Sequence, residues 1–214
     1  MDLKIEQIYG YPVGIVNLNK NLYNKKNIIK SIESNFKTNK KRNKWDGHTT
    51  NIHHAYDDWQ NPVYKKVDFK TLFPLYDAVI KNYLGKLFTT PVYEYRFDVV
   101  NYTCMHKSGE MGEHVHSSDF TMVHYIQFDK FHHKSTCFCN PYPHANYLYQ
   151  LSTNLIPLFN DKNPVNCWAF KEWYLDIKED DLIINPGVMK HKVNLQDSKK
   201  KSRITIVVNL FVNR

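Results

Sequence analysis

Two histidines separated by one residue are the strongest sign of chemistry in this sequence. His114 and His116 lie in the segment EHVHSSD, which has the character of a β-strand. Side chains two residues apart on a strand point to the same face, so both imidazoles can bind one metal ion. A third ligand must come from elsewhere, and His191, after a strand-like segment and a Pro-Gly turn, is available. The competing interpretation is surface or hydrogen-bonded histidines in a chain that contains 11 of them.

An arginine near the C-terminus favours the metal-site interpretation. Arg203 lies twelve residues beyond His191 and opens a segment rich in Val and Ile, which predicts a strand. From there its guanidinium can form a bidentate pair with a carboxylate held beside a metal ion. Thr205 follows two residues later on the same strand face and can add a hydroxyl group.

The elements that must position these residues change in kind along the chain. Residues 8–18 predict a strand, and residues 22–36 and 69–87 predict helices that cover a sheet. Pro74 lies near the start of the second helix or kinks it.

After residue 91 the chain becomes a run of short strand-like segments, with an irregular insertion at about residues 142–166. Strands in series after helices predict a mainly β chain, a sandwich or barrel flanked by N-terminal helices. The predicted strands are VYEYRFDVVNY, HVHSSDF, MVHYIQF, STCFCN, WAFKEWYLDI, DLIINP and RITIVVNLFV.

Composition limits the class of protein. The chain has 214 residues, of which 42% are hydrophobic and 23% charged, so it is globular and long enough for one domain. It has no apolar run that could span a bilayer and no secretory signal, so we expect a cytoplasmic protein with free thiols. The net charge of +8 allows an anionic partner, but only four of the 29 basic residues are Arg. Nucleic-acid binding is therefore not favoured.

The order of these motifs resembles the iron(II)- and 2-oxoglutarate-dependent oxygenases with a double-stranded β-helix, above all those of bacteria and their phages. The resemblance implies a single oxygenase domain over residues 1–214, acting in the host cytoplasm if phage-encoded. Residues 1–90 would support a jelly-roll or cupin-like core at residues 91–214. The matching motifs are Tyr102, Gly109, HVH at 114–116, Tyr125, INPGVMKH ending at His191, and RIT at 203–205.

The resemblance also implies a role for each matching residue. His114 and His191 are similar to the first and last ligands of a facial triad that binds Fe(II). His116 stands where the family usually has Asp or Glu, so either three imidazoles bind the iron or Asp119 supplies a carboxylate after a local bulge. The cofactor-binding residues implied for 2-oxoglutarate are Arg203 and Thr205 at its distal carboxylate, with Tyr102 and Tyr125 lining the pocket.

The implied reaction hydroxylates an unidentified substrate, a protein side chain, a metabolite or a nucleobase. It uses O2 and 2-oxoglutarate and yields succinate and CO2. The same segments are similar to the two cupin motifs, so the alternative is a cupin-like module that binds a metal or a small anion without oxygenase activity. The long separation of His116 from His191, and the presence of Arg203, favour the oxygenase.

Overall fold

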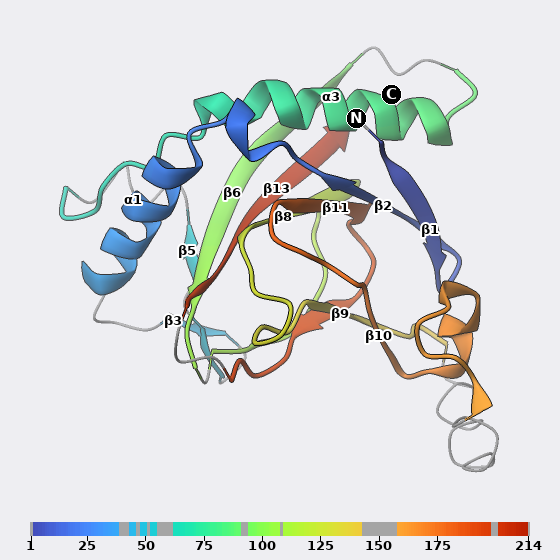
Figure 1. Cartoon of the computed structure of the whole chain (residues 1–214). Coiled ribbons are helices and arrows are strands. Elements are labelled where there is room, and N and C mark those ends of the chain that lie inside the picture. The colour runs from blue at the N-terminus through green and yellow to red at the C-terminus, as the bar shows by residue number, and fades with distance from the viewer. Residues whose placement is uncertain are drawn as a thin grey trace.

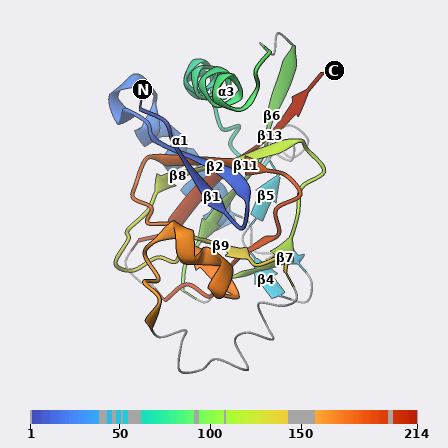
Figure 2. The same cartoon turned by 90° about the vertical axis from the view of Figure 1, so that its right-hand side faces the viewer.

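A computed structural model of the chain shows three layers (Figure 1). It describes residues 2–38, 62–90, 94–107, 109–142, 158–197 and 201–213, and the backbone of short strands at 43–45, 48–50 and 52–54. Two helices form one outer layer, a large antiparallel sheet the middle layer, and a small antiparallel sheet the other outer layer. In Figure 2 strands β7 and β9 lie on the side of the large sheet opposite α1 and α3.

The large sheet has seven strands in the order β1-β2-β11-β8-β13-β6-β5, and every neighbouring pair is antiparallel. Its members are β1 (Lys4–Ile8), β2 (Tyr11–Asn17), β5 (Ile52–His54), β6 (Tyr95–Met105), β8 (Phe120–Gln127), β11 (Asp181–Pro186) and β13 (Arg203–Val212).

The small sheet has four strands in the order β10-β9-β12-β7, also antiparallel. A separate pair is formed by β3 (Asn43–Trp45) and β4 (His48–Thr50). The members of the small sheet are β7 (Met111–His114), β9 (Thr136–Cys139), β10 (Glu172–Tyr174) and β12 (His191–Val193).

The helices cover the outer face of the large sheet with their apolar sides. Helix α1 (Lys25–Thr38) buries Ile28 and Ile32, and α3 (Phe73–Leu87) buries Tyr76, Val79, Ile80, Tyr83 and Leu84. A proline in the first turn of α3 is compatible with the helix because no amide donor is needed there. The short 3-10 turns are η1 (Lys20–Leu22), η2 (Lys70–Leu72) and η4 (Pro164–Ala169).

The alternation of side chains along β13 assigns its two faces to different environments. Ile204, Ile206, Val208 and Leu210 belong to the core beneath the helices. The intervening residues from Arg203 to Asn209 line a cavity on the side of the small sheet. A second core lies between the sheets around Tyr125, Phe138 and Trp173. One strand therefore contributes both to the helix-side core and to the wall of a polar site.

The prediction of a mainly β chain flanked by helices is confirmed, with local differences. The strand predicted at 8–18 corresponds to β2 but begins later, at Tyr11, because Tyr9 and Gly10 form the turn from β1. Their φ values of 54° and 82° are those that a tight two-residue turn requires. WAFKEWYLDI forms η4 and the short β10 rather than one long strand. The strand predicted in HVHSSDF ends at His114. Most of the predicted insertion at 142–166 lies outside the described residues.

Strand β2 pairs with β11, so the large sheet draws strands from both predicted regions of the chain.

The four cysteines are buried, and none of them forms a disulfide. No helix in the described part of the chain has the length and apolarity needed to cross a membrane.

Candidate metal centre

The structure brings three histidines from separate segments together. His114 ends β7, His116 follows it, and His191 begins β12. One ring nitrogen from each of them lies within 4.8 Å of those of the other two. The ring centroids are 4.3 Å apart for His114 and His191 and 5.2 Å apart for His116 and His191. In the described residues this is the one group of His, Cys, Asp or Glu side chains that could hold a metal ion.

Backbone pairing explains this convergence. His191 lies directly opposite His114 in the antiparallel β7–β12 pair, so their side chains share a face. The amide of His116 donates a hydrogen bond to the carbonyl of Gly187, 2.8 Å away, in the turn before β12. There is no room for a side chain at Gly187, because a Cβ atom there would lie 2.0 Å from the carbonyl oxygen of Ser118. The glycine therefore lets the two ligand-bearing segments touch.

Two of the imidazoles have a fixed tautomer. Nδ1 of His114 donates to the carbonyl of Gly112 at 2.8 Å, and Nδ1 of His191 donates to the carbonyl of Met189 at 2.9 Å. Because a carbonyl only accepts, each Nδ1 carries the proton and each Nε2 keeps its lone pair for another partner.

Electrostatics keeps two of the three imidazoles neutral. Burial, with the neighbouring His114, lowers the pKa of His116 to about 4. Burial also lowers the pKa of His191 to about 3, again with a contribution from His114. Both imidazoles are therefore uncharged near neutral pH, the form that binds metal ions.

The cluster opens on a cavity of about 200 Å³ between the two sheets, and a buried cation lies in the wall of this cavity. Arg203 is 1% exposed, and its Nε donates to the carbonyl of Lys134 at 3.0 Å. Its Nη1 lies 3.4 Å from the hydroxyl of Thr205, whereas Nη2 is buried without a hydrogen-bond partner. In the described residues no carboxylate forms an ion pair with it, and burial lowers the pKa of its guanidinium. Such a charge is costly unless an anion enters the cavity.

Hydroxyl groups surround the guanidinium. Thr205 and Thr103 are hydrogen-bonded at 2.7 Å between their Oγ1 atoms, and both line the cavity. Tyr125 lies behind the arginine, with Cζ of Arg203 5.3 Å from its ring centroid. The Tyr125 hydroxyl donates to Oγ1 of Thr136 at 2.7 Å, so this tyrosine supports the wall rather than forming part of it.

Two residues predicted for the site lie elsewhere. Tyr102 packs in the core beneath the helices, where its hydroxyl accepts a hydrogen bond from Asn35, because it faces the opposite side of β6 from Asn101 and Thr103. The prediction that Tyr102 lines the cosubstrate pocket does not fit this position. Asp119 is exposed, and its Oδ2 accepts a hydrogen bond from the amide of Val212 at 2.9 Å. Its carboxylate is not part of the histidine group.

Sequence reasoning missed four polar residues of the cavity wall: Asn101, Thr103, Thr136 and Asn209. A usable signal was present. Asn209 continues the two-residue spacing of Arg203 and Thr205 along one strand, so it shares their face. The apolar part of the wall consists of Val100, Met111, Val115, Val123, Val193 and Val207.

This arrangement can hold a divalent metal ion and an anion side by side. Three neutral imidazoles suit zinc, copper, nickel or iron, and they leave the charge of the ion uncompensated by the protein. The unpartnered Nη2 of Arg203 adds a second attraction for an anion in the same cavity.

Comparisons with known proteins place the fold. No protein-family model and no curated protein matches the chain. A prolyl hydroxylase from Trichoplax adhaerens, in complex with a hypoxia inducible factor peptide, has a TM-score of 0.54 and 13% identity, with 94% of this chain and 83% of that chain covered. An oxidoreductase of the 2OG-Fe(II) oxygenase family from Burkholderia pseudomallei has a TM-score of 0.45 and 14% identity over 66% of this chain. This chain spans 56% of that protein.

A third similar structure is HygX from Streptomyces hygroscopicus with iron bound, at a TM-score of 0.40 and 8% identity, covering 77% of this chain and 83% of that one. At 13% identity the likeness to the prolyl hydroxylase concerns the fold. The β-rich architecture found here is therefore one that it shares with the prolyl hydroxylase.

Proposed function

We propose that this chain is an Fe(II)- and 2-oxoglutarate-dependent oxygenase that hydroxylates a substrate and releases succinate and CO2. The observation that carries the proposal is one cavity that contains both a three-imidazole cluster and a buried arginine, for which the described residues provide no carboxylate partner. The shared fold with a prolyl hydroxylase supports it. We further assign the two packed sheets to a double-stranded β-helix within one oxygenase domain.

His114, His116 and His191 are the proposed ligands of the iron. The donor set fits the ion, because His116 and His191 are neutral and backbone carbonyls orient His114 and His191. Of the two alternatives for the second ligand, the geometry favours His116, since the Asp119 carboxylate is engaged with Val212. Three neutral ligands would leave the ion more positive than a site with a carboxylate, which favours anionic cosubstrates.

Arg203 is the proposed partner of the distal carboxylate of 2-oxoglutarate, and Thr205 adds a hydroxyl. The Lys134 carbonyl and the Tyr125 ring hold the guanidinium in place, so the cosubstrate meets a preorganised charge. The valines of the wall exclude water around the reacting atoms. The chemistry that iron supplies when bound is the O2-dependent decarboxylation of 2-oxoglutarate, coupled to hydroxylation of a substrate C–H bond.

Succinate formation tests this proposal. Purified protein is incubated aerobically with Fe(II) and 2-oxoglutarate, and succinate is quantified. We expect slow uncoupled succinate formation by the wild type and its loss in His191→Ala and Arg203→Ala variants. A protein that binds the metal and 2-oxoglutarate but forms no succinate would instead be the cupin-like binding module. A protein that binds neither would contradict both functions.

A further inference from the structure

Unsatisfied polar atoms gather in the cavity. Among the described residues, four buried side-chain nitrogen or oxygen atoms have no hydrogen-bond partner. Three of them belong to residues that line this one cavity: Arg203 Nη2, Asn101 Oδ1 and Asn209 Oδ1. The fourth is Nε2 of His124, which lies on the helix side of the sheet beside Tyr76. Buried polar atoms in folded proteins nearly always have partners, so this concentration indicates a place for ligand atoms.

The proposed cosubstrate accounts for only one of the three atoms. Arg203 and Asn209 lie six positions apart on the same face of β13, which corresponds to roughly 20 Å of extended strand. Asn101 pairs with Val207 across β6 and β13, so it lies near the Asn209 end. A single 2-oxoglutarate that contacts Arg203 and the metal leaves both asparagines unsatisfied.

The metal site shares its cavity with these asparagines. Asn209 and His116, the proposed second ligand, both line it. A ligand that reaches Asn209 therefore occupies the same small cavity as the imidazole cluster, where the group to be oxidised must be. This position suits the substrate.

The chemistry of this end of the cavity is selective. Two carboxamide oxygens seek N–H or O–H donors. Arg203 is the only cationic side chain among the described lining residues, and it is at the other end. The remaining wall there is apolar, with Val100, Val115 and Val207. Among the described lining residues at this end, no side chain is cationic, even though the chain as a whole has a net charge of +8.

We propose that Asn101 and Asn209 bind the substrate and that the substrate enters as an uncharged, amide-bearing group whose N–H atoms donate to their Oδ1 atoms. This inference rests on the proposed oxygenase function and names its substrate class. The cavity, at about 200 Å³, is smaller than the ~300–1,000 Å³ of pockets that enclose a whole drug-sized ligand. Only the reacting end of a larger molecule enters it together with 2-oxoglutarate, and the rest lies outside.

Binding of three small probes tests the proposal without catalysis. The protein is loaded with Zn(II) and 2-oxoglutarate, and ligand-observed saturation-transfer NMR is recorded with acetamide, N,N-dimethylacetamide and acetate. Acetamide has N–H donors, dimethylacetamide has the same carbonyl without donors, and acetate is an anion. We expect saturation transfer to acetamide, and a response roughly tenfold weaker for the other two, as the loss of a buried hydrogen bond predicts.

Variants assign the response to the two asparagines. Asn101→Leu and Asn209→Leu should remove the acetamide response, Asn209→Asp should keep it because an acceptor remains, and Asn27→Leu on the exposed side of α1 should leave it unchanged. An equal or stronger response to acetate, an acetamide response that survives both Leu variants, or no response to acetamide would overturn the inference. Calorimetric titration of 2-oxoglutarate into the wild type separates the outcomes, since a failure of the proposed function appears there as no metal-dependent binding.

Discussion

Arg203 has its charge in the interior of the protein, held by a carbonyl and a hydroxyl oxygen and, in the part of the chain that the structure describes, by no carboxylate. A buried cation of this kind destabilises the ligand-free protein, because desolvation is not compensated by an opposite charge. An anion that binds beside the guanidinium would offset this desolvation cost and stabilise the folded protein. The same residue therefore links the stability of the chain to the occupancy of its cavity.

Replacing this arginine by methionine should separate stability from binding. We expect Arg203→Met to unfold at the same temperature as the ligand-free wild type or higher, since the buried charge is gone. For the metal-loaded wild type, 2-oxoglutarate at a hundred times its Kd should add about 2.7 kcal/mol of stability, and the variant should show none of this gain. Thermal unfolding with and without 2-oxoglutarate measures both effects. A gain in Arg203→Met equal to that of the wild type would remove Arg203 from the anion site.

The second ligand can be decided by a pair of substitutions. His116→Ala should weaken Fe(II) or Zn(II) binding by more than the roughly 10–100-fold typical of losing a supporting residue, since a ligand atom itself is removed. Asp119→Asn should leave metal affinity unchanged, because the Asp119 carboxylate contacts the amide of Val212 instead. Metal titration with a competing chelator measures both. The reverse pattern would assign the site to a carboxylate.

At the scale of elements, the turn between β11 and β12 determines where His191 and His116 meet. Gly187 packs on the backbone of Ser118, and its amide donates to the carbonyl of Asp119 at 3.0 Å. Any side chain at this position would force the turn away from the segment that bears His116. The contact of one glycine thus controls the spacing of two proposed ligands.

Alanine substitution at two glycines tests this turn. Gly187→Ala should destabilise the protein by about 1–3 kcal/mol, because its Cβ would meet backbone that cannot move cheaply, and should weaken metal binding. Gly85→Ala in α3 is the matched control, since nothing lies within 4 Å of its added Cβ. That control should gain about 0.5–1 kcal/mol of helix stability. Urea unfolding reports both values, and an unaffected Gly187→Ala would show that the turn has room.

A helix or strand could be predicted from the sequence where its own local pattern determines it, but not where contacts distant in sequence do. The predicted strand RITIVVNLFV corresponds to β13 with the same ends, because a continuous β-branched run fits a strand covered on both faces. Local pattern could not show that WAFKEWYLDI begins as a 3-10 turn. There Asn163 caps the backbone at Val165, and the segment packs on β1 through contacts distant in sequence.

The residues of the candidate site could also be predicted only in part. Residue type and spacing predict its histidines and Arg203, but they do not predict which face of β6 carries Tyr102. Only pairing with β13 establishes that Asn101 and Thr103 point into the cavity and Tyr102 away from it. Register is a property of two strands, so one strand read by itself leaves the assignment open.

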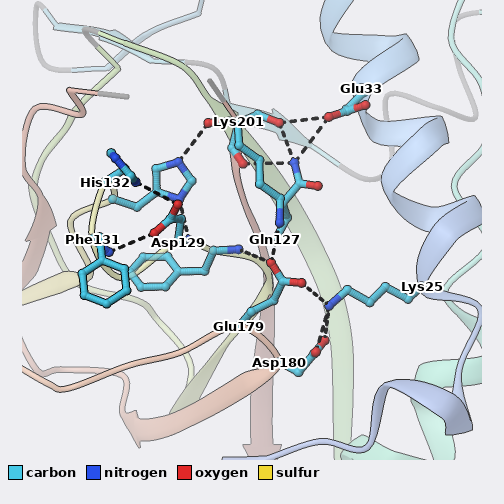
Figure 3. Close-up of polar contacts among 12 residues, drawn as sticks. Lys25, Glu33, Gln127, Asp129, Phe131, His132, Glu179, Asp180 and Lys201 are labelled. Atoms are coloured by element: carbon cyan, nitrogen blue, oxygen red, sulfur yellow. Dashed lines mark hydrogen bonds and ion pairs between the residues drawn. The ribbon is translucent and has the colours of Figure 1, made fainter. Parts of the chain in front are cut away.

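At the scale of the whole molecule, a polar network joins α1 to the sheets and to the segment that leads into β13 (Figure 3). Glu179 accepts hydrogen bonds from Lys25 and Lys201, both at 2.8 Å, and from the amide of Phe128 at 3.0 Å. Lys25 also contacts Asp180 at 2.7 Å. Elements far apart in sequence are thereby fixed around one carboxylate.

This network makes stability depend on acid. Burial disfavours the charged form of Glu179, but the hydrogen bonds from Lys201, Lys25 and Phe128 outweigh it and lower its pKa from 4.5 to about 2. A group whose pKa is lower in the folded state stabilises the protein above its unfolded pKa. This contribution should therefore be complete above pH 4.5 and fade as the pH falls towards 2.

Glu179→Gln isolates that contribution. The difference in unfolding free energy between wild type and variant should be constant above pH 4.5 and should shrink below it. Denaturant unfolding at a series of pH values gives this difference, and Asp197→Asn at an exposed position serves as the control variant. A difference that grows as the pH falls would mean that the network does not hold Glu179 ionised.

The most direct measurement for the account as a whole is an anaerobic calorimetric titration of 2-oxoglutarate, made with and without Fe(II) bound. We predict that the protein binds one equivalent of the ion, and that 2-oxoglutarate then binds in a manner that His191→Ala and Arg203→Ala each abolish. Binding of 2-oxoglutarate with equal affinity in the presence and absence of the ion, or no binding in either case, would contradict a shared metal and anion site in this cavity.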